Sequence, residues 1–260
     1  MALHERRRQA GHISGAQLQA GTPEKKIKAS RHSRGLVLNT NNFVVTGLYY
    51  VTFTSVCHFR PQAMEKDFET LIAGFIETKI GISDHFLSER LATHLKENLL
   101  SLHHQKLLVS AGTGNGEKLN FNAHVRSDVI YWLDRKHNNS FENEFFDLVE
   151  DFIRYLNKSC FAGITGYEFH YSLYEAGSFY SRHRDQFKNH KGRKYSMISY
   201  LNSDWQQEHG GELLISQALG DQRIAPTQGK TVFFKSNELI HEVLPTSQVR
   251  LSLTGWLKGN

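Results

Sequence analysis

The order of the hydrophobic patterns places the strongest constraint on the fold of this chain. Apolar residues follow helical spacing between residues 64 and 156, whereas short β-prone segments dominate between residues 167 and 256. Helices followed by many short strands indicate an α+β domain with a mainly β core, built on a pair of antiparallel sheets or on a barrel. The sequence shows no internal repeat that would favour a solenoid or a propeller.

Three segments with helical spacing are expected to form helices. The first carries Phe68, Leu71, Ile72, Phe75 and Ile76. Ser88 is the expected N-cap of the second, whose apolar face consists of Leu91, Leu95, Leu99 and Leu102. Ser140 is the expected N-cap of the third, with Phe145, Leu148, Val149, Phe152, Ile153 and Leu156 facing inward. The expected strands are Lys79–Ser83, Tyr167–Tyr174, Ser196–Asn202, Glu212–Ile215, Thr231–Phe234 and Arg250–Trp256.

The N-terminal region differs in composition from the rest of the chain. Residues 1–35 hold eight Lys and Arg against two Glu, which leaves a net charge of −1 for the remainder of a chain whose total is +5. We therefore expect residues 1–62 to be a basic, disordered extension and residues 63–260 to form one domain. Because the basic charge belongs to the extension, a nucleic-acid surface on the folded domain is not expected.

No membrane segment or secretory leader is expected. The apolar stretch Phe43–Phe59 is interrupted by polar residues and is shorter than the roughly 18 apolar residues of a spanning helix. It also lies too far from the first basic residues for a signal peptide. The extension is either an accessory tail or sequence upstream of a start at Met64. Two cysteines, Cys57 and Cys160, are too few for a disulfide framework, so a cytoplasmic location is expected.

The segment that ends in His183-x-Asp185 contains a candidate metal site. Side chains at positions i and i+2 of an extended chain share a face, so both residues can bind one ion. His241, in the segment Leu-Ile-His-Glu-Val, is the best candidate for a third ligand. Two histidines and one carboxylate leave coordination positions open, as non-haem Fe(II) oxygenases require. His-x-Asp alone is weak evidence, because the chain has 15 histidines.

The segment Arg250–Trp256 supports this interpretation. Its alternate residues Arg250, Ser252, Thr254 and Trp256 share one strand face. A guanidinium group with hydroxyl neighbours is suited to bidentate binding of a carboxylate. An ordinary edge strand with one solvent-exposed face would show the same alternation.

Several motifs in this order resemble those of the iron- and 2-oxoglutarate-dependent dioxygenases of the prolyl 4-hydroxylase superfamily, in particular the hypoxia-inducible-factor prolyl hydroxylases and their bacterial relatives. The matching run covers about residues 64–260. It departs from the family at Ser127, where relatives often have glycine, and is one residue shorter between Tyr174 and His183. The motifs are Val125–Trp132, similar to an Arg-Gly-Asp-x-x-x-Trp run, His183-x-Asp185, Ser199–Trp205, Gly210–Leu214, Gly229–Phe234, His241–Val243 and Arg250–Trp256.

The resemblance implies a double-stranded β-helix, or jelly roll, with the N-terminal helices packed against it. It implies that His183, Asp185 and His241 bind Fe(II), and that Arg250, helped by the Tyr200 hydroxyl, binds the distal carboxylate of 2-oxoglutarate. Tyr174, Thr254 and Trp256 would line the same pocket. The implied catalytic residues are the three ligands and Arg250. O₂ would be the second cosubstrate, and ascorbate binding is a further implication.

The activity implied is hydroxylation of a prolyl residue in a protein or peptide substrate, with release of succinate and CO₂. A dioxygenase that acts on a small molecule or on another side chain would have the same metal site. A non-catalytic metal-binding jelly roll is the third alternative, although it would not need Arg250 and Tyr200. The glycine-rich loop 110–123 is expected to be a mobile flap over the substrate. The oligomeric state is not predicted.

Overall fold

The computed structural model describes residues 62–259 except residues 113–121, 123, 186–191 and 219. The N-terminal extension, with its apolar segment Phe43–Phe59, lies outside the described residues, as does most of the glycine-rich loop 110–123. The predictions made for these two segments therefore stay predictions.

Three helices precede or interrupt the first strands: α1 (Gln62–Thr78), α2 (Glu89–His104) and α3 (Ser140–Cys160). Ser88 caps α2 as predicted, because its side chain accepts a hydrogen bond from the backbone N–H of Leu91. The predicted cap of α3 is wrong by one residue. Asn139 has the extended backbone of an N-cap and accepts bonds from the two N–H groups that follow Ser140, which is itself the first helical residue. None of the helices in the described part of the chain is long and apolar enough to cross a membrane.

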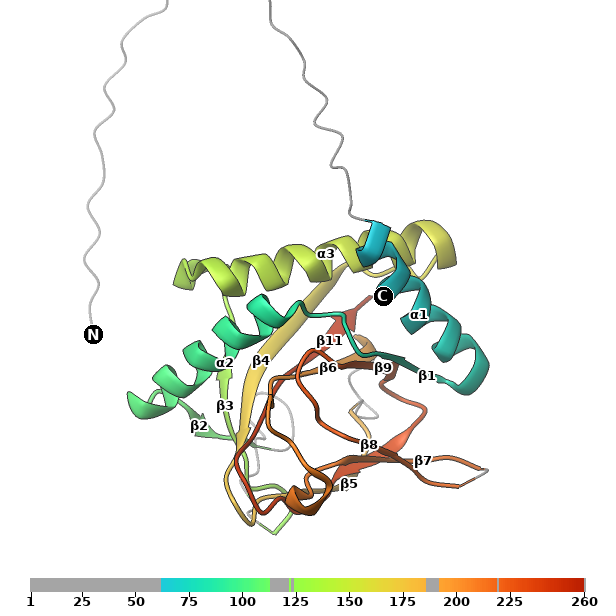
Figure 1. The fold of residues 1–260 in the computed structure, drawn as a ribbon. Helices are drawn as coiled ribbons and strands as arrows, with labels where there is room; N and C mark the ends of the chain where they lie inside the picture. The colour runs from blue at the N-terminus through green and yellow to red at the C-terminus, as the bar shows by residue number, and fades with distance from the viewer. Residues whose placement is uncertain (1–61, 113–121, 123, 186–191, 219, 260) are drawn as a thin grey trace, which may run out of the picture. The chain divides into compact units, whose positions relative to one another are not determined.

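Two antiparallel sheets form the core of the domain. The larger sheet has the strand order β1 (Ile80–Ser83), β9 (Thr231–Lys235), β6 (Arg193–Tyr200), β11 (Arg250–Lys258), β4 (Gly166–Tyr174), β3 (Val129–Trp132) and β2 (Val109–Ser110). The smaller sheet has the order β5 (Tyr180–His183), β10 (Ile240–Val243), β7 (Leu213–Ser216) and β8 (Gln222–Ile224). This arrangement confirms the predicted α+β jelly roll with helices packed against it (Figure 1).

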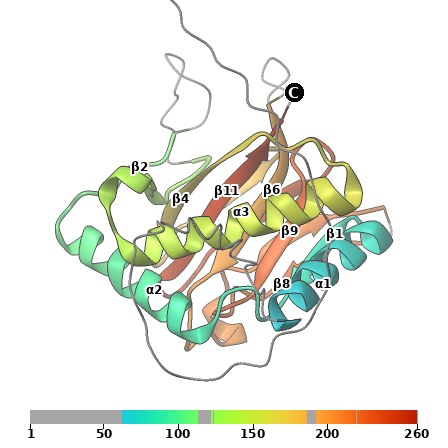
Figure 2. The same cartoon turned by 90° about the horizontal axis from the view of Figure 1, so that it is seen from above.

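The alternation of residues along the central strands gives the larger sheet two different faces. The outer face packs against the three helices, which cover it in Figure 2, and includes Phe169, Tyr171 and Leu173 of β4. On β11, Leu251 and Leu253 lie on this side. We call the other side of the larger sheet the inner face; its residues on β6 and β9 pack against the smaller sheet through the cluster Ile198, Tyr200, Leu213, Ile215, Val232 and Phe234.

The inner face is polar where β4 and β11 lie side by side. The two strands pair over nine residues, from Arg250 opposite Tyr174 to Lys258 opposite Gly166. Because side chains alternate, the residues that β11 presents to the inner face are Arg250, Ser252, Thr254 and Trp256, as predicted from the sequence. Those of β4 are Glu168, His170, Ser172 and Tyr174. A hydrophobic sheet that carries a row of buried polar groups at its centre is typical of a binding site.

Candidate active site

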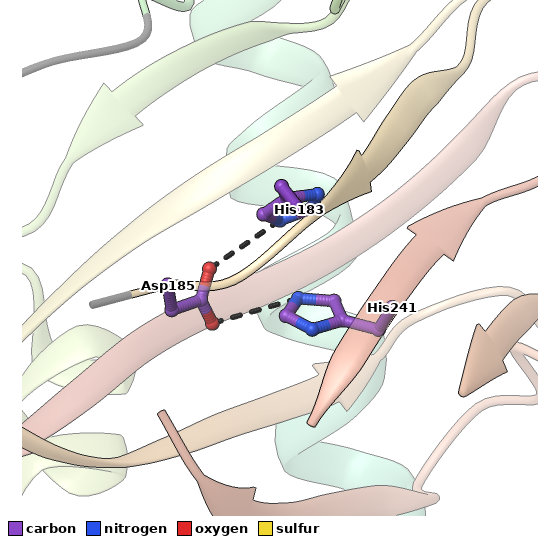
Figure 3. Close-up of side chains that lie close together, drawn as sticks. All are labelled: His183, Asp185 and His241. Carbon is purple, nitrogen blue, oxygen red and sulfur yellow. Dashed lines mark ion pairs between the residues drawn. The ribbon is translucent and has the colours of Figure 1, made fainter. Parts of the chain in front are cut away.

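Three predicted metal ligands meet at one end of the smaller sheet (Figure 3). His183 is the last residue of β5 and lies directly opposite His241 of β10, while Asp185 follows β5 by two residues. Nε2 of His183 lies 3.4 Å from one carboxylate oxygen of Asp185, and Nε2 of His241 lies 3.6 Å from the other. One ligand atom from each residue lies within 4.8 Å of the other two. His183 and His241 are 58 positions apart in the sequence, and the pairing of β5 with β10 brings them together.

Backbone carbonyl groups orient both imidazole rings. Nδ1 of His183 lies 2.8 Å from the carbonyl oxygen of Ser181, and Nδ1 of His241 lies 3.3 Å from that of Leu239. Since a carbonyl only accepts, each Nδ1 carries the proton and donates it. In the neutral ring, Nε2 then keeps the lone pair that a metal ion can bind. Such outer hydrogen bonds are the usual way in which metal-binding histidines are fixed.

The carboxylate of Asp185 is held ionised. Burial alone would raise its pKa, but the positive charge of His241 in its protonated form, with hydrogen bonds from His183 and His241, holds the pKa well below its ordinary value. Ser196 of β6 donates a hydrogen bond of 2.6 Å to Oδ2 of Asp185, and the Ser236 hydroxyl lies 2.9 Å from that of Ser196. Two neutral imidazole nitrogens and one carboxylate form the donor set of a mononuclear non-haem Fe(II) site with open coordination positions.

Arg250 forms a second polar centre, at the start of β11. Its side chain is 2% exposed, its Nε donates to the carbonyl oxygen of Gly211 at 2.7 Å, and its Nη1 donates to the Ser252 hydroxyl at 3.3 Å. Its Nη2 and the hydroxyl of Tyr200 are both buried and have no hydrogen-bond partner among the described residues. A buried guanidinium with an unsatisfied donor is costly unless a ligand completes it.

The surroundings of Arg250 fit a carboxylate ligand. The guanidinium lies 4.9 Å from the ring centre of Tyr174 and 5.1 Å from that of Tyr200, so two aromatic walls flank it. Burial raises the pKa of the Tyr200 hydroxyl to about 12, although Arg250 opposes the shift, and burial also raises the pKa of Tyr174. Both phenols are therefore neutral donors. A fixed cation with an adjacent neutral donor is what one carboxylate of 2-oxoglutarate would need.

Residues 169–258, from β4 to the end of β11, match the model of the 2OG-Fe(II) oxygenase superfamily. The match contains all three residues of the His183–Asp185–His241 cluster and also Arg250. These residues form a 2OG-Fe(II) oxygenase domain. The protein is accordingly a 2-oxoglutarate-dependent dioxygenase, as the sequence motifs predicted.

Solved structures of the same fold include two prolyl hydroxylases. A Pseudomonas putida prolyl-4-hydroxylase is 29% identical, with a TM-score of 0.67 over 74% of this chain and 99% of the other. A Trichoplax adhaerens prolyl hydroxylase in complex with a hypoxia-inducible-factor peptide is 23% identical, with a TM-score of 0.68 over 76% of this chain and 91% of the other. The α-ketoglutarate-dependent epimerase SnoN of nogalamycin biosynthesis shares the fold at 14% identity, with a TM-score of 0.54 over 75% of this chain and 84% of the other.

The two polar centres of the oxygenase domain, the His183–Asp185–His241 cluster and the surroundings of Arg250, fit different ligands. When bound at the triad, Fe(II) would supply, with O₂ and 2-oxoglutarate, the oxidation of an unactivated C–H bond, with succinate and CO₂ as the co-products. His183, Asp185 and His241 fit the ion, and Arg250 with Tyr200 fits the distal carboxylate of the cosubstrate. The residues of the chain supply binding, orientation and exclusion of water. Each of these groups is buried or nearly so, which strengthens the electrostatic contacts inside the site.

Only glycine fits at Gly211, which precedes β7, because the side chain of Arg250 lies so close to it. Its backbone has a φ of +73°, and a Cβ atom there would lie 3.1 Å from Cδ of Arg250 and 3.0 Å from Cβ of Thr246. The glycine therefore allows its own carbonyl to come within hydrogen-bonding distance of the guanidinium. The predicted motif Gly210–Leu214 thus contributes a backbone acceptor to the anchor.

Trp256 and Thr254 lie further along β11 than the anchor. Trp256 lies six positions after Arg250, a distance of roughly 20 Å along an extended strand. The indole packs against His170 and Trp132, and the guanidinium of Arg193 lies 3.4 Å above it. Its Nε1 is buried without a partner among the described residues. Both residues are on the inner face, as predicted; Trp256 contacts residues of β3, β4 and β6, and Thr254 contacts Ser172 of β4 and Ser252 of β11.

Tyr180 has a closer relation to the site than the sequence indicated. Its ring is stacked on that of His183, with 3.5 Å between the ring centres. The guanidinium of Arg126 lies 4.3 Å from the ring centre of Tyr180 and forms an ion pair of 2.6 Å with Asp128. The spacing of Tyr180 before the His-x-Asp motif was the only signal available in the sequence. Ser196, which bonds Asp185, gave no signal at all.

A groove of about 390 Å³ lies beside His183 on the smaller sheet. It is lined by Arg182, His183, Arg184, Ser216 and Ile240. Arg182 donates to Ser216 and forms ion pairs with acidic neighbours, so much of its charge is balanced.

Proposed function

We propose that this dioxygenase hydroxylates a prolyl residue in a protein or peptide substrate. In this proposal His183, Asp185 and His241 bind Fe(II), and Arg250 with Tyr200 binds 2-oxoglutarate. The observation that carries the prolyl assignment is the 29% identity to the Pseudomonas putida prolyl-4-hydroxylase over 99% of that chain. The complex of the Trichoplax adhaerens enzyme with a peptide shows that this fold can accept a polypeptide substrate.

The local chemistry near Trp256 supports a polypeptide substrate. Trp132 is 45% exposed at the edge of the inner face, and its indole lies 6.3 Å from that of the buried Trp256. An aromatic surface that runs from solvent to a buried donor suits a flexible chain that inserts one small ring-shaped side chain. Tryptophan and arginine side chains are also enriched where polypeptides bind tightly.

The test is an assay of the full chain with Fe(II), 2-oxoglutarate and a library of proline-containing peptides. A gain of 16 Da on proline, dependent on 2-oxoglutarate and matched by succinate formed, would support the proposal. The Asp185→Ala variant is the matched control, because it removes one ligand and should form no product. The assay is run with and without ascorbate, since ascorbate binding is part of the same expectation.

A second function has one observation in its favour. The SnoN epimerase shows that the fold also serves an enzyme of nogalamycin biosynthesis, so the fold alone does not select a polypeptide. Succinate formation without any proline-dependent product would favour a small molecule or another side chain. If wild-type protein with Fe(II) formed no succinate from 2-oxoglutarate under any condition, the assignment as a catalyst would fail.

A further inference from the structure

His170 is a buried histidine on the inner face that belongs to neither polar centre. It lies in the middle of β4, directly opposite Trp132 of β3 and directly opposite Thr254 of β11. The residue is 2% exposed. A fully buried imidazole among aromatic rings needs a structural or functional reason, because burial of a polar ring is unfavourable without partners.

The imidazole ring supports the indole of Trp256. Its centre lies 5.6 Å from that of Trp256 and 5.0 Å from that of Trp132, which it meets edge to face. Arg193 covers the Trp256 indole at 3.4 Å, so the indole has a charged group over its ring and the His170–Trp132 pair beside it. Removal of the His170 ring would leave space next to the Trp256 indole.

The hydrogen bonds of His170 define its protonation state. Nδ1 lies 3.0 Å from the carbonyl oxygen of Tyr171 and 3.1 Å from the hydroxyl of Ser172. Because the carbonyl can only accept, Nδ1 carries the proton. Burial, together with the positive charge of Arg126, lowers the pKa of the ring to about 4, so it is neutral near pH 7. The Ser172 hydroxyl is then free to donate to Thr254.

A line of hydroxyl groups joins His170 to the cosubstrate anchor. The Ser172 oxygen lies 3.5 Å from that of Thr254, which lies 3.5 Å from that of Ser252. Arg250 donates from Nη1 to the Ser252 hydroxyl at 3.3 Å. Each of these hydrogen bonds is weak. Together they favour the orientation of the Arg250 guanidinium in which Nη1 points to the Ser252 hydroxyl.

We propose that His170 is a positioning residue that acts at both ends of the inner face. Its ring fixes the Trp256 indole, and its Nδ1–H, through Ser172, Thr254 and Ser252, holds the Arg250 guanidinium in the orientation that receives a carboxylate. The second role rests on the proposed binding of 2-oxoglutarate by Arg250. The first role does not depend on it.

Two substitutions separate the two roles. His170→Phe keeps a ring between the indoles but removes the Nδ1 donor. His170→Asn places an amide N–H near the position of Nδ1 but removes the ring. If His170 had only a structural role, both variants would alter 2-oxoglutarate binding and the surroundings of Trp256 in the same way. The proposal predicts that His170→Phe alters mainly 2-oxoglutarate binding and that His170→Asn alters mainly the Trp256 indole.

The first measurement is calorimetric titration of 2-oxoglutarate into the full chain loaded with Mn(II), which accepts similar nitrogen and oxygen ligands. We expect His170→Phe to weaken binding about three- to tenfold, the loss of one neutral hydrogen bond. His170→Asn should stay within about twofold of wild type. Ser172→Ala should follow His170→Phe, because it interrupts the same line.

The second measurement is the ¹⁹F spectrum of the full chain labelled with 5-fluorotryptophan. The Trp256 signal is the one that disappears in Trp256→Phe. We expect His170→Asn to shift and broaden this signal, and His170→Phe to leave it sharp. Ser199→Ala is the matched control, because its buried hydroxyl pairs with Thr231 and faces away from Ser172. It should change neither readout.

Unchanged 2-oxoglutarate binding in His170→Phe would overturn the role at Arg250, and an unchanged Trp256 signal in His170→Asn would overturn the role at the indole. Equal changes of both readouts in the two variants would overturn the proposal in favour of a purely structural histidine. Failure of the wild-type protein to bind 2-oxoglutarate would instead contradict the proposed function. The Trp256 signal would still decide the first role in that case.

Discussion

The hydroxyl of Ser196 donates a hydrogen bond of 2.6 Å to the carboxylate of Asp185. Ser196 is fully buried in β6, a strand of the larger sheet, whereas Asp185 follows β5 of the smaller sheet. This bond therefore ties the candidate metal site to the sheet that carries Arg250, the proposed cosubstrate anchor. The other carboxylate oxygen of Asp185, Oδ1, faces Nε2 of His183.

Ser196→Ala should weaken metal binding without removing a ligand. Loss of an outer hydrogen-bond partner typically costs about 10- to 100-fold in metal affinity or activity. We expect an effect near the lower end of this range, because Asp185 keeps its contacts with both histidines. The measurement is competition for Fe(II) or Mn(II) with a chelator. Ser199→Ala, in the same strand but facing away, should bind metal as wild type does.

Removal of either histidine ligand should abolish turnover. His183→Ala or His241→Ala leaves two protein ligands, so formation of succinate from 2-oxoglutarate should fall below detection while the fold is retained. His94→Ala is the matched control, since His94 stacks on Phe141 at the helical surface. Turnover near the wild-type rate at limiting Fe(II) in either ligand variant would show that the ligand assignment is wrong.

Arg250→Lys should weaken 2-oxoglutarate binding with little change in metal binding. Lysine keeps the charge but loses the planar fork, including the Nη2 donor that has no partner among the described residues. The loss of one charge-assisted hydrogen bond costs about 1.5–3 kcal/mol, or roughly ten- to hundredfold in apparent affinity. Titration of 2-oxoglutarate against the Fe(II)-loaded variant measures this. An unchanged half-saturation concentration would contradict the anchor.

The sequence was sufficient for the parts of the fold that follow simple periodicity. The alternation in β11 placed Arg250 and Trp256 on one face and Leu251 and Leu253 on the other, and the structure agrees. Ser88 was recognised as a cap because it directly precedes the periodic residues of α2. Asn139 was missed because Ser140, also a good cap residue, stands next to it, and only the backbone conformation separates the two.

The strands β5 and β10 were not predicted, although they hold two of the three candidate ligands. Each has only four residues, and polar and charged side chains interrupt its pattern, since the site itself occupies the positions that would otherwise be apolar. The partners of these ligands come from distant segments. Ser196 reaches Asp185 only because β6 lies across from the smaller sheet, a relation that periodicity does not encode.

A chain that starts at Met64 should remain folded and active. The described core needs α1, because Phe68 and Leu71 are fully buried and a Cβ at Gly81 would lie 2.1 Å from the Leu71 carbonyl oxygen. Met64 itself packs against this core. We expect the melting temperature to stay within a few degrees of that of the full chain. A chain that starts at Lys79 is the control and should not fold, and a large loss of stability on removal of residues 1–63 would show that the extension packs on the domain.

The buried imidazole of His170 should make stability depend on pH in a defined window. In the folded state burial, with the charge of Arg126, lowers its pKa from 6.5 to about 4. In the unfolded state the ring takes up a proton near its ordinary pKa. Between these two values the unfolded state binds the extra proton, so the free energy of unfolding falls as the pH falls from 6.5 towards 4. At about 1.4 kcal/mol per pKa unit, the full effect is roughly 3 kcal/mol.

His170→Phe isolates this contribution because phenylalanine does not titrate. The free energies of unfolding of both metal-free proteins are measured by chemical denaturation at intervals between pH 6.5 and 4. The other charged groups near the ring, Arg126, Asp128 and Arg193, are present in both proteins, so most of their own titration cancels in the difference. We expect wild type to lose stability relative to His170→Phe as the pH falls through this window, and to show no relative change above it. Parallel curves would mean that His170 becomes protonated in the folded protein near its ordinary pKa, and that the ring is not held neutral by its surroundings.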